Sequence, residues 1–182
     1  MADGGPSRKS VALGSRPRLD VAVVRHDEAW RVARVTDAIL ARAARAGFNA
    51  AMLSSLGTYE VSILLTDDQE MRALNRTWRG KDAPTNVLSF PASDDPTEPG
   101  LLGDVALAYE TTLDEAQAIG IAVSDHAAHL VVHGVLHLLG FDHMEEDEAE
   151  QMEALERQAL ASLGIADPYA ERDGALPAEV SP

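Results

Sequence analysis

The chain contains no cysteine, and this absence limits its chemistry. It can form no disulfide, and it has no thiolate to offer a metal ion, so any metal site must use nitrogen or oxygen ligands. The lack of disulfides is also typical of a cytoplasmic protein, and we expect that location. Basic residues are scarce as well. There are 15 Lys and Arg against 30 Asp and Glu, and the net charge of −15 argues against nucleic-acid binding over the whole surface.

Apolar runs long enough to cross a membrane are also missing. The longest run is interrupted by His133 and His137, and we expect no membrane partner. Arg8 and Lys9 stand near the N-terminus, but no hydrophobic region follows them before Arg16, so we expect no signal peptide. The chain has 182 residues, of which 46% are hydrophobic. This size and composition predict one domain with a sizeable core.

The most informative stretch covers residues 133–143 and reads His-Gly-Val-Leu-His-Leu-Leu-Gly-Phe-Asp-His. His133 and His137 are four residues apart and would share one face of a helix. Gly140 can end that helix in a left-handed conformation, so that the chain turns back and presents His143 to the same point. Three imidazoles that leave a fourth position open are typical of a catalytic zinc site. The pattern therefore predicts one zinc ion per chain, bound by these three histidines.

The histidine spacing equals that of the metzincin proteases, His-Glu-x-x-His-x-x-Gly-x-x-His, except at the second position. Gly134 stands where those proteases have the glutamate that acts as general base. A glycine inside a helix costs about 1 kcal/mol relative to alanine, so we expect Gly134 to allow close approach of substrate or of a neighbouring strand. The missing base argues against peptide hydrolysis. A metalloprotease-like hydrolase without the usual glutamate is one alternative function.

The apolar periodicity predicts a single α+β domain, in which a four-stranded mixed sheet packs with about five helices. The central helix carries the zinc ligands, as in a zincin-like motif. We expect residues 18–169 to form this domain, with disordered tails at 1–17 and 170–182. Strands are expected at 18–24, 59–65, 87–90 and 102–108.

Capping residues predict where the helices begin. The first helix is expected to run from a cap at Asp27 to about residue 46, with Gly47 as its stop. Capping-box spacings at Thr66 and Thr112 predict two further helices, which end near residues 78 and 120. Ser124 is the expected cap of the histidine helix, and the last helix should begin near residue 147 and end at residue 164.

Positive charge is concentrated in one segment of this acidic chain. Residues 71–81 include Arg72, Arg76, Arg79 and Lys81 and contain no acidic residue. Such a segment can bind a polyanion locally, or it can simply be a solvated helix face. The opposite pattern occurs at 145–156, where seven acids predict a solvated face or a docking surface for a basic partner.

Three blocks of the sequence resemble the YbeY endoribonucleases, also called rRNA maturation factors. The first is Leu-Asn-Arg-Thr-Trp-Arg-Gly-Lys-Asp at 74–82 with Pro-Thr-Asn-Val-Leu-Ser-Phe-Pro at 84–91. The second is Leu-Gly-Asp at 102–104, and the third is the histidine segment with the residues after it up to 153. Asp-Pro-Tyr at 167–169 also fits, so the resemblance covers about residues 60–169.

The resemblance implies a zinc-dependent, single-strand-specific endoribonuclease that acts in small-subunit rRNA maturation and ribosome quality control. It implies zinc ligands at His133, His137 and His143 and a catalytic arginine at Arg79. The implied partners are single-stranded or ribosomal RNA and the ribosome or one of its proteins. We add Arg76 and Lys81 as candidate substrate-binding residues. A non-enzymatic ribosome-assembly factor with a structural metal is a second alternative, and the oligomeric state stays open.

Two other histidines, His126 and His129, precede His133 by seven and four residues. They are either extra ligands and substrate-orienting groups or hydrogen-bonded residues near the core. The nucleophile also has two candidates, a zinc-bound hydroxide and the 2′-hydroxyl of the RNA itself.

Overall fold

The computed structural model describes residues 16–51, 56–143 and 145–170. Its sheet has four strands in the order β1-β2-β4-β3. β1 is parallel to β2 and β2 to β4, whereas the edge strand β3 is antiparallel to β4, so the predicted mixed sheet is confirmed. The strands are β1 (Arg18–Arg25), β2 (Thr58–Thr66), β3 (Val87–Pro91) and β4 (Leu101–Ala108).

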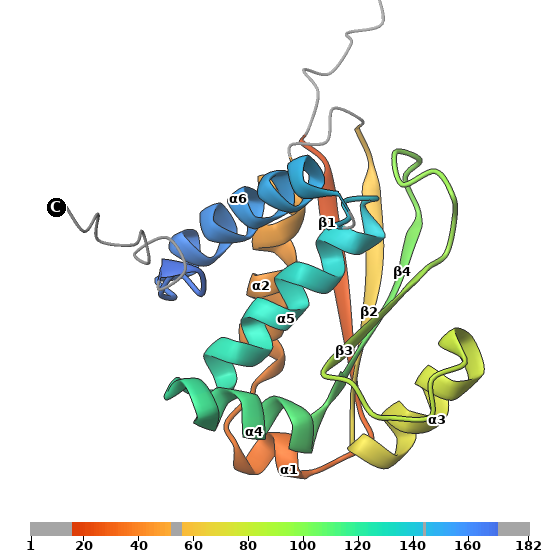
Figure 1. Ribbon diagram of the computed structural model, residues 1–182. Coiled ribbons are helices and arrows are strands. Elements are labelled where there is room, and N and C mark those ends of the chain that lie inside the picture. The colour runs from red at the N-terminus through yellow and green to blue at the C-terminus, as the bar shows by residue number, and fades with distance from the viewer. Residues whose placement is uncertain (1–15, 52–55, 144, 171–182) are drawn as a thin grey trace, which may run out of the picture.

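Six helices accompany the sheet in the described residues. Helices α2, α5 and α6 lie on one side of the sheet and α3 lies on the other (Figure 1). The prediction of about five helices joined α1, which has four residues, to α2 as one helix. The helices are α1 (Ala29–Val32), α2 (Asp37–Ala50), α3 (Asp68–Arg79), α4 (Tyr109–Ile119), α5 (Val123–Leu138) and α6 (Glu146–Leu163). The tails predicted at 1–17 and 170–182 lie outside the described residues, except for residues 16, 17 and 170.

The strand β4 separates two apolar clusters because successive side chains of a strand point to opposite faces. Val105 and Leu107 belong to the large cluster on the side of α5, and both are fully buried. Ala106 and Ala108 belong to a small cluster on the side of α3, together with Met71. The α5 side therefore contains the main core. This position explains why α5 is apolar on almost all its faces.

The helix predicted from Asp27 is in fact two helices. Arg34 interrupts it with a left-handed φ of +60°, and a new helix begins after Thr36, whose hydroxyl accepts the N–H of residue 39. The predicted stop at Gly47 is wrong as well, because this glycine lies inside α2. A Cβ atom there would lie 3.3 Å from the carbonyl oxygen of Val132. Gly47 thus allows α2 to pack closely on α5.

The predicted caps of α3 and α4 are also wrong by one to a few residues. Asp67, not Thr66, caps α3 by accepting the N–H of Glu70. Thr112 lies inside α4 and is buried, where its hydroxyl donates to the carbonyl of Ala108 at 2.6 Å. Both threonines form other hydrogen bonds, because local side-chain bonds compete with helix capping.

Helix α5 begins one residue before the predicted cap at Ser124, and no side chain caps it. Among the described residues, no single helix is long and apolar enough to cross a membrane. The α4–α5 pair meets that test of length and composition only with a bend of 113° between the two helices. Much of the apolar character of α5 is accounted for by its burial in the core.

Candidate metal centre

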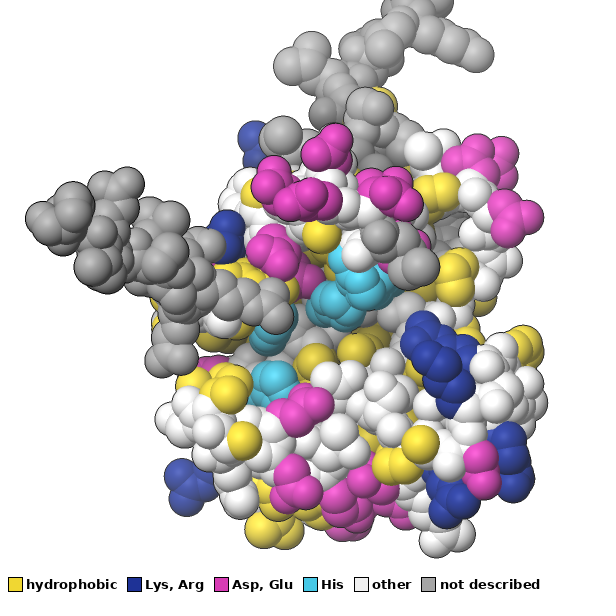
Figure 2. Space-filling view, in the orientation of Figure 1, with side chains coloured by type: hydrophobic (Ala, Val, Ile, Leu, Met, Phe, Trp, Pro, Cys, Tyr) yellow, Lys and Arg dark blue, Asp and Glu magenta, His cyan; other side chains and the backbone are white. Residues whose placement is uncertain are grey.

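The structure brings His133, His137 and His143 together at the C-terminal end of α5. One ring nitrogen from each lies within 4.8 Å of the other two. We call this group the histidine centre. It forms because His133 and His137 are one helical turn apart, which places their rings 4.5 Å from each other between centroids. Figure 2 shows the histidines gathered on one face of the molecule.

The third histidine reaches the centre through a tight turn after the helix. Gly140 adopts a left-handed φ of +86°, as predicted from the sequence. Its N–H donates to the carbonyl of His137 at 3.0 Å, and the N–H of Phe141 donates to Leu136 at 3.1 Å. The chain then reverses, and the His143 ring lies 5.0 Å from the His137 ring between centroids.

The hydrogen bonds of the two helical histidines determine which ring nitrogens face the centre. Nδ1 of His137 lies 3.0 Å from the carbonyl oxygen of Phe141. A carbonyl can only accept, so Nδ1 carries the proton and Nε2 presents a lone pair. Nδ1 of His133 lies 2.6 Å from a carboxylate oxygen of Glu156, which orients that ring in the same way.

These tautomers fit a bound cation. Nε2 of His133 and Nε2 of His137 lie 3.0 Å apart. Two lone pairs facing each other at this distance repel unless a positive charge lies between them. Nitrogens placed about 2.0–2.1 Å from a tetrahedral zinc ion are about 3.3 Å from each other, which is close to the observed separation. The residues present therefore suit zinc or a similar metal ion.

The protonation state of His137 also suits a metal ligand. Burial lowers the pKa of His137 to about 4, and the neighbouring His133 and His143 act in the same direction. The ring is therefore neutral at physiological pH. A neutral imidazole is the form that binds a metal ion.

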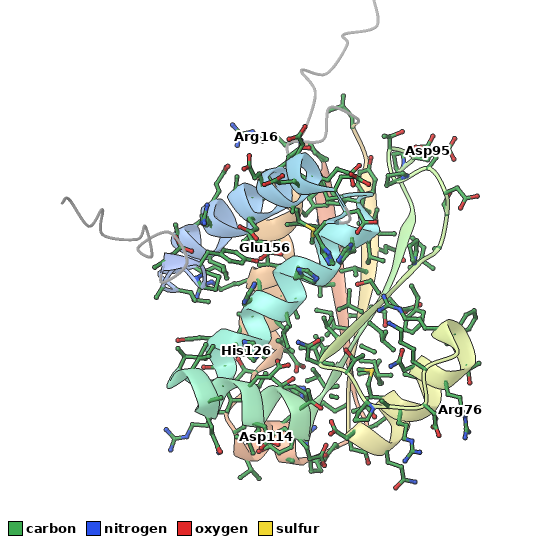
Figure 3. The ribbon with its side chains drawn as sticks, in the orientation of Figure 1. Arg16, Arg76, Asp95, Asp114, His126 and Glu156 are labelled. Carbon is green, nitrogen blue, oxygen red and sulfur yellow. The ribbon has the colours of Figure 1, made fainter. Side chains whose placement is uncertain are left out.

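Glu156 contacts the histidine centre but was not among the site residues predicted from the sequence. Its side chain is 1% exposed and lies between α6 and α5 (Figure 3). One carboxylate oxygen accepts from His133 at 2.6 Å, and the other lies 2.8 Å from Nε2 of His129. The hydroxyl of Tyr169 donates to the same carboxylate. Burial raises the pKa of Glu156, but the hydrogen bonds from His129 and His133 outweigh it and lower the pKa well below its usual range.

A sequence signal for Glu156 did exist. Met152, Glu156, Ala159 and Leu160 are the buried residues of α6 and form one face. An acidic residue on an otherwise apolar stripe has to be paired when it is buried. In the sequence this signal is masked by the neighbouring acids, such as Glu148 and Glu150, which are exposed.

The metal affinity should depend on Glu156. We expect Glu156→Gln to weaken metal binding by about 10- to 100-fold, which is the usual effect of removing the partner of a liganding histidine. The measurement is a competition titration with a chromophoric chelator. Glu150→Gln is the matched control, because it removes the same charge from an exposed site on the same helix. Equal affinities for Glu156→Gln and the wild type would contradict the proposed orienting contact.

The other two histidines of α5 do not converge on the histidine centre. His126 lies 2.7 Å from the carboxylate of Glu115, on the side of α5 that faces α4 (Figure 3). His129 bonds to Glu156 and packs edge-on against Tyr169, with the ring centroids 6.1 Å apart. Of the two readings given for these residues, the contacts favour that of hydrogen-bonded residues near the core. Glu115, three residues after Thr112 in the predicted capping box, bonds to His126 instead.

Gly134 is required by the two strands beside it. A Cβ atom there would lie 2.7 Å from Val105 Cγ1 on β4 and 3.1 Å from Ser89 Oγ on β3. The Ser89 hydroxyl also donates to the Gly134 carbonyl at 3.1 Å. Close approach of a neighbouring strand, one of the two predicted reasons, therefore applies. A glutamate at this position would meet the same strands, so the position of the metzincin base is closed by packing.

We expect Gly134→Ala to destabilise the fold by about 1–3 kcal/mol, because the added methyl group overpacks the contact with Val105. The measurement is urea unfolding. The same change made in a Val105→Ala background should cost less, since the clashing methyl groups are gone. An equal cost in both backgrounds would show that the clash is not its source.

The predicted substrate residues lie on another part of the surface. Arg79 is the last residue of α3 and is exposed, as are Arg76 and Lys81. Arg76 projects outward from α3 (Figure 3). A group of Lys and Arg side chains appears on the same face as the histidines, on the side of the molecule where α3 lies (Figure 2). The roles of these three residues stay predictions.

Comparisons with known proteins agree with the geometry. A family model described as Endoribonuclease YbeY matches residues 27–164. A relative with that name from Azorhizobium caulinodans is 51% identical over 168 residues, which are 88% of this chain and 99% of the relative. Another from Bradyrhizobium diazoefficiens is 44% identical over 172 residues, 91% of this chain and 92% of the relative. The solution structure of TM1509 from Thermotoga maritima has a similar fold, with a TM-score of 0.51 at 18% identity, over 82% of this chain and 98% of that one.

Proposed function

The chain belongs to the YbeY endoribonuclease family, and from this membership we propose that it cleaves single-stranded RNA at the histidine centre, in the maturation of ribosomal RNA. The observation that carries the proposal is the pair of Nε2 atoms 3.0 Å apart. Both can present lone pairs to the same point, which suits a cation bound there. We propose zinc as that cation, with His133, His137 and His143 as its ligands.

A bound zinc ion supplies Lewis acidity, which polarises a phosphoryl oxygen and lowers the pKa of coordinated water. The chain's own residues provide the rest of the site. Glu156 and the Phe141 carbonyl hold the His133 and His137 rings in the liganding tautomer. A cavity of about 370 Å³ adjoins the centre and is lined by His133, His143 and Tyr169 among others. We propose that only the scissile phosphate enters this cavity, while the rest of the RNA lies on the side of the basic residues.

The proposed role of Arg79 is to bind the phosphate. Its guanidinium offers a planar fork of donors that matches two phosphate oxygens. Arg76 and Lys81 stand close by in the sequence and would attract the flanking backbone. This local basic segment is what allows a chain with net charge −15 to bind RNA at one place.

We further propose a cytoplasmic location and a ribosomal partner. Acidic side chains gather on the upper part of the face seen in Figure 2, where the N-terminal half of α6 lies in Figure 1. This surface complements a basic ribosomal protein and would repel RNA. The strand would then be confined to the opposite side, where the basic residues lie.

Neither alternative function is favoured. A metalloprotease would need a glutamate at position 134, and the close packing of Gly134 against β3 and β4 leaves no room for that side chain. Both alternatives also lack the support of family membership, since the relatives are named as endoribonucleases.

The test is cleavage of an unstructured, end-labelled RNA by nuclease-free protein, with the same RNA annealed to its complement as the comparison. We expect cleavage of the single strand, loss of cleavage after the metal is removed with a chelator, and recovery when zinc is restored. A casein digest run in parallel should stay intact. Equal cleavage before and after verified metal removal would disprove the metal-dependent mechanism.

A further inference from the structure

Trp78 is an aromatic side chain that the fold holds at the surface instead of burying. It is 69% exposed, although most large apolar side chains of the described residues are in the core. Its ring meets Phe90 edge-on, with the centroids 5.7 Å apart and the planes at 61°. An edge contact supports the indole in one orientation and leaves much of its surface accessible.

Trp78 borders a groove of about 560 Å³ on the α3 side of the sheet. Leu64, Leu74 and Phe90 line it, and all three pack on the small apolar cluster of that side. The groove is therefore apolar and backed by ordered core residues. Asp104 also lines it and is exposed, so one carboxylate acceptor is available among apolar walls.

The charges beside Trp78 identify the kind of ligand. Arg76, Arg79 and Lys81 lie within three residues of it and are all exposed. They suit an anionic backbone, whereas the groove with its acidic Asp104 suits a neutral, planar group with hydrogen-bond donors. A nucleotide combines these two parts, since its base is planar and its phosphate is anionic. An apolar peptide would match the groove but not the basic residues.

We propose that Trp78 and this groove bind an unpaired nucleobase of the RNA strand that reaches the histidine centre. The inference rests on the proposed function and adds a base-binding subsite to it. The base stacks on the indole, and the Asp104 carboxylate accepts from an exocyclic amino group of the base. Only an unpaired base can enter, so the subsite contributes to selectivity for single strands.

The edge strand β3 connects this subsite with the histidine centre. The Ser89 side chain bonds to Gly134 on α5, which carries the metal ligands. The next side chain, Phe90, points to the groove on the opposite side of the sheet. An RNA strand that passes over β3 can therefore place one base against Trp78 while a neighbouring phosphate approaches the histidine centre. In the described residues, no further strand pairs with this edge of the sheet (Figure 1).

The chain allows a direct test because it contains only two tryptophans. Trp30 is fully buried, so RNA can quench only Trp78 by stacking. The zinc-loaded protein is titrated with a short single-stranded 2′-O-methyl oligoadenylate, and a gel confirms that this probe stays intact. We expect the oligomer to quench the exposed tryptophan of the wild type. Trp78→Phe should bind nearly as tightly but show no quenching.

The affinity of Trp78→Ala for this probe should fall by about 5- to 150-fold, the usual effect of one lost base–aromatic stack. An oligomer of the same length and charge with abasic positions should bind the wild type and Trp78→Ala equally. Ile119→Ala is the control for loss of exposed apolar surface, since that side chain is 61% exposed on α4. It should leave binding unchanged.

Two results would overturn the inference. One is unchanged tryptophan emission when the wild type is saturated with RNA, and the other is wild-type affinity of Trp78→Ala. A quench by an apolar peptide in place of RNA would assign the groove to a protein partner instead. Binding is measured without cleavage, so the subsite stands or falls separately from the proposed activity. If the protein binds the base but cleaves no RNA, the proposed activity would be disproved and the proposed subsite would still be supported.

Discussion

Replacing His137 with alanine is expected to reduce the metal content from about one ion per chain to near zero and to abolish RNA cleavage. His137 supplies one of only three converging imidazoles, and its Nε2 lies 3.0 Å from that of His133. The two remaining histidines, one on α5 and one on the turn after it, should bind zinc too weakly to keep it in dilute protein, because catalytic sites use three protein ligands. Elemental analysis of the purified protein measures the effect.

The matched control is His126→Ala. It removes the same side chain from the same helix, but His126 bonds to Glu115 and lies outside the histidine centre. We expect this variant to keep a full equivalent of metal even if it is less stable. A full equivalent of metal in His137→Ala would show that the ligands are assigned wrongly.

Thermal unfolding gives a second readout that does not depend on activity. A ligand present at about 100 times its dissociation constant stabilises the folded state by about 2.7 kcal/mol. For a chain of this length, that corresponds to a rise in melting temperature of about 5–11 °C. The wild type should show this rise when zinc is added, whereas His137→Ala should not respond.

The sequence predicted the histidine centre because its geometry is local. His133, His137 and His143 lie within eleven residues, and helix periodicity and one glycine are enough to bring them together. Glu156 could not be found in the same way. It comes from another helix, and its contact with His133 depends on how α6 packs on α5, which no spacing within the sequence reveals.

The errors in the helix boundaries have a related cause. Several polar residues compete for each free backbone N–H, and packing decides between them. Thr66 has capping-box spacing, yet the adjacent Asp67 provides the cap. A glycine such as Gly47 normally indicates the end of a helix. Here it lies inside α2, because only a residue without a side chain allows the close contact of α2 with Val132. Strand positions were predicted more closely, since β-branched and apolar runs between turn residues have fewer alternatives.

The catalytic importance of Arg79 can be separated from that of the metal. Arg79→Ala should keep the fold and a full equivalent of metal, because Arg79 is an exposed residue at the end of α3 and not a member of the histidine centre. If it binds the phosphate in the transition state, single-turnover cleavage should slow by about 10²- to 10³-fold, by analogy with the loss of one transition-state donor.

Substitution by lysine refines this test. Arg79→Lys should recover only part of the lost rate, since an ammonium group cannot reproduce the two parallel hydrogen bonds of a guanidinium. Arg72→Ala is the matched control. It removes the same charge from the same exposed helix, but Arg72 is paired with Asp82 at 2.8 Å and should matter little. The measurement is cleavage of a single-stranded RNA by variants whose metal content has been verified. Cleavage by Arg79→Ala at the rate of Arg72→Ala would remove Arg79 from the mechanism and leave the phosphate to the metal centre alone.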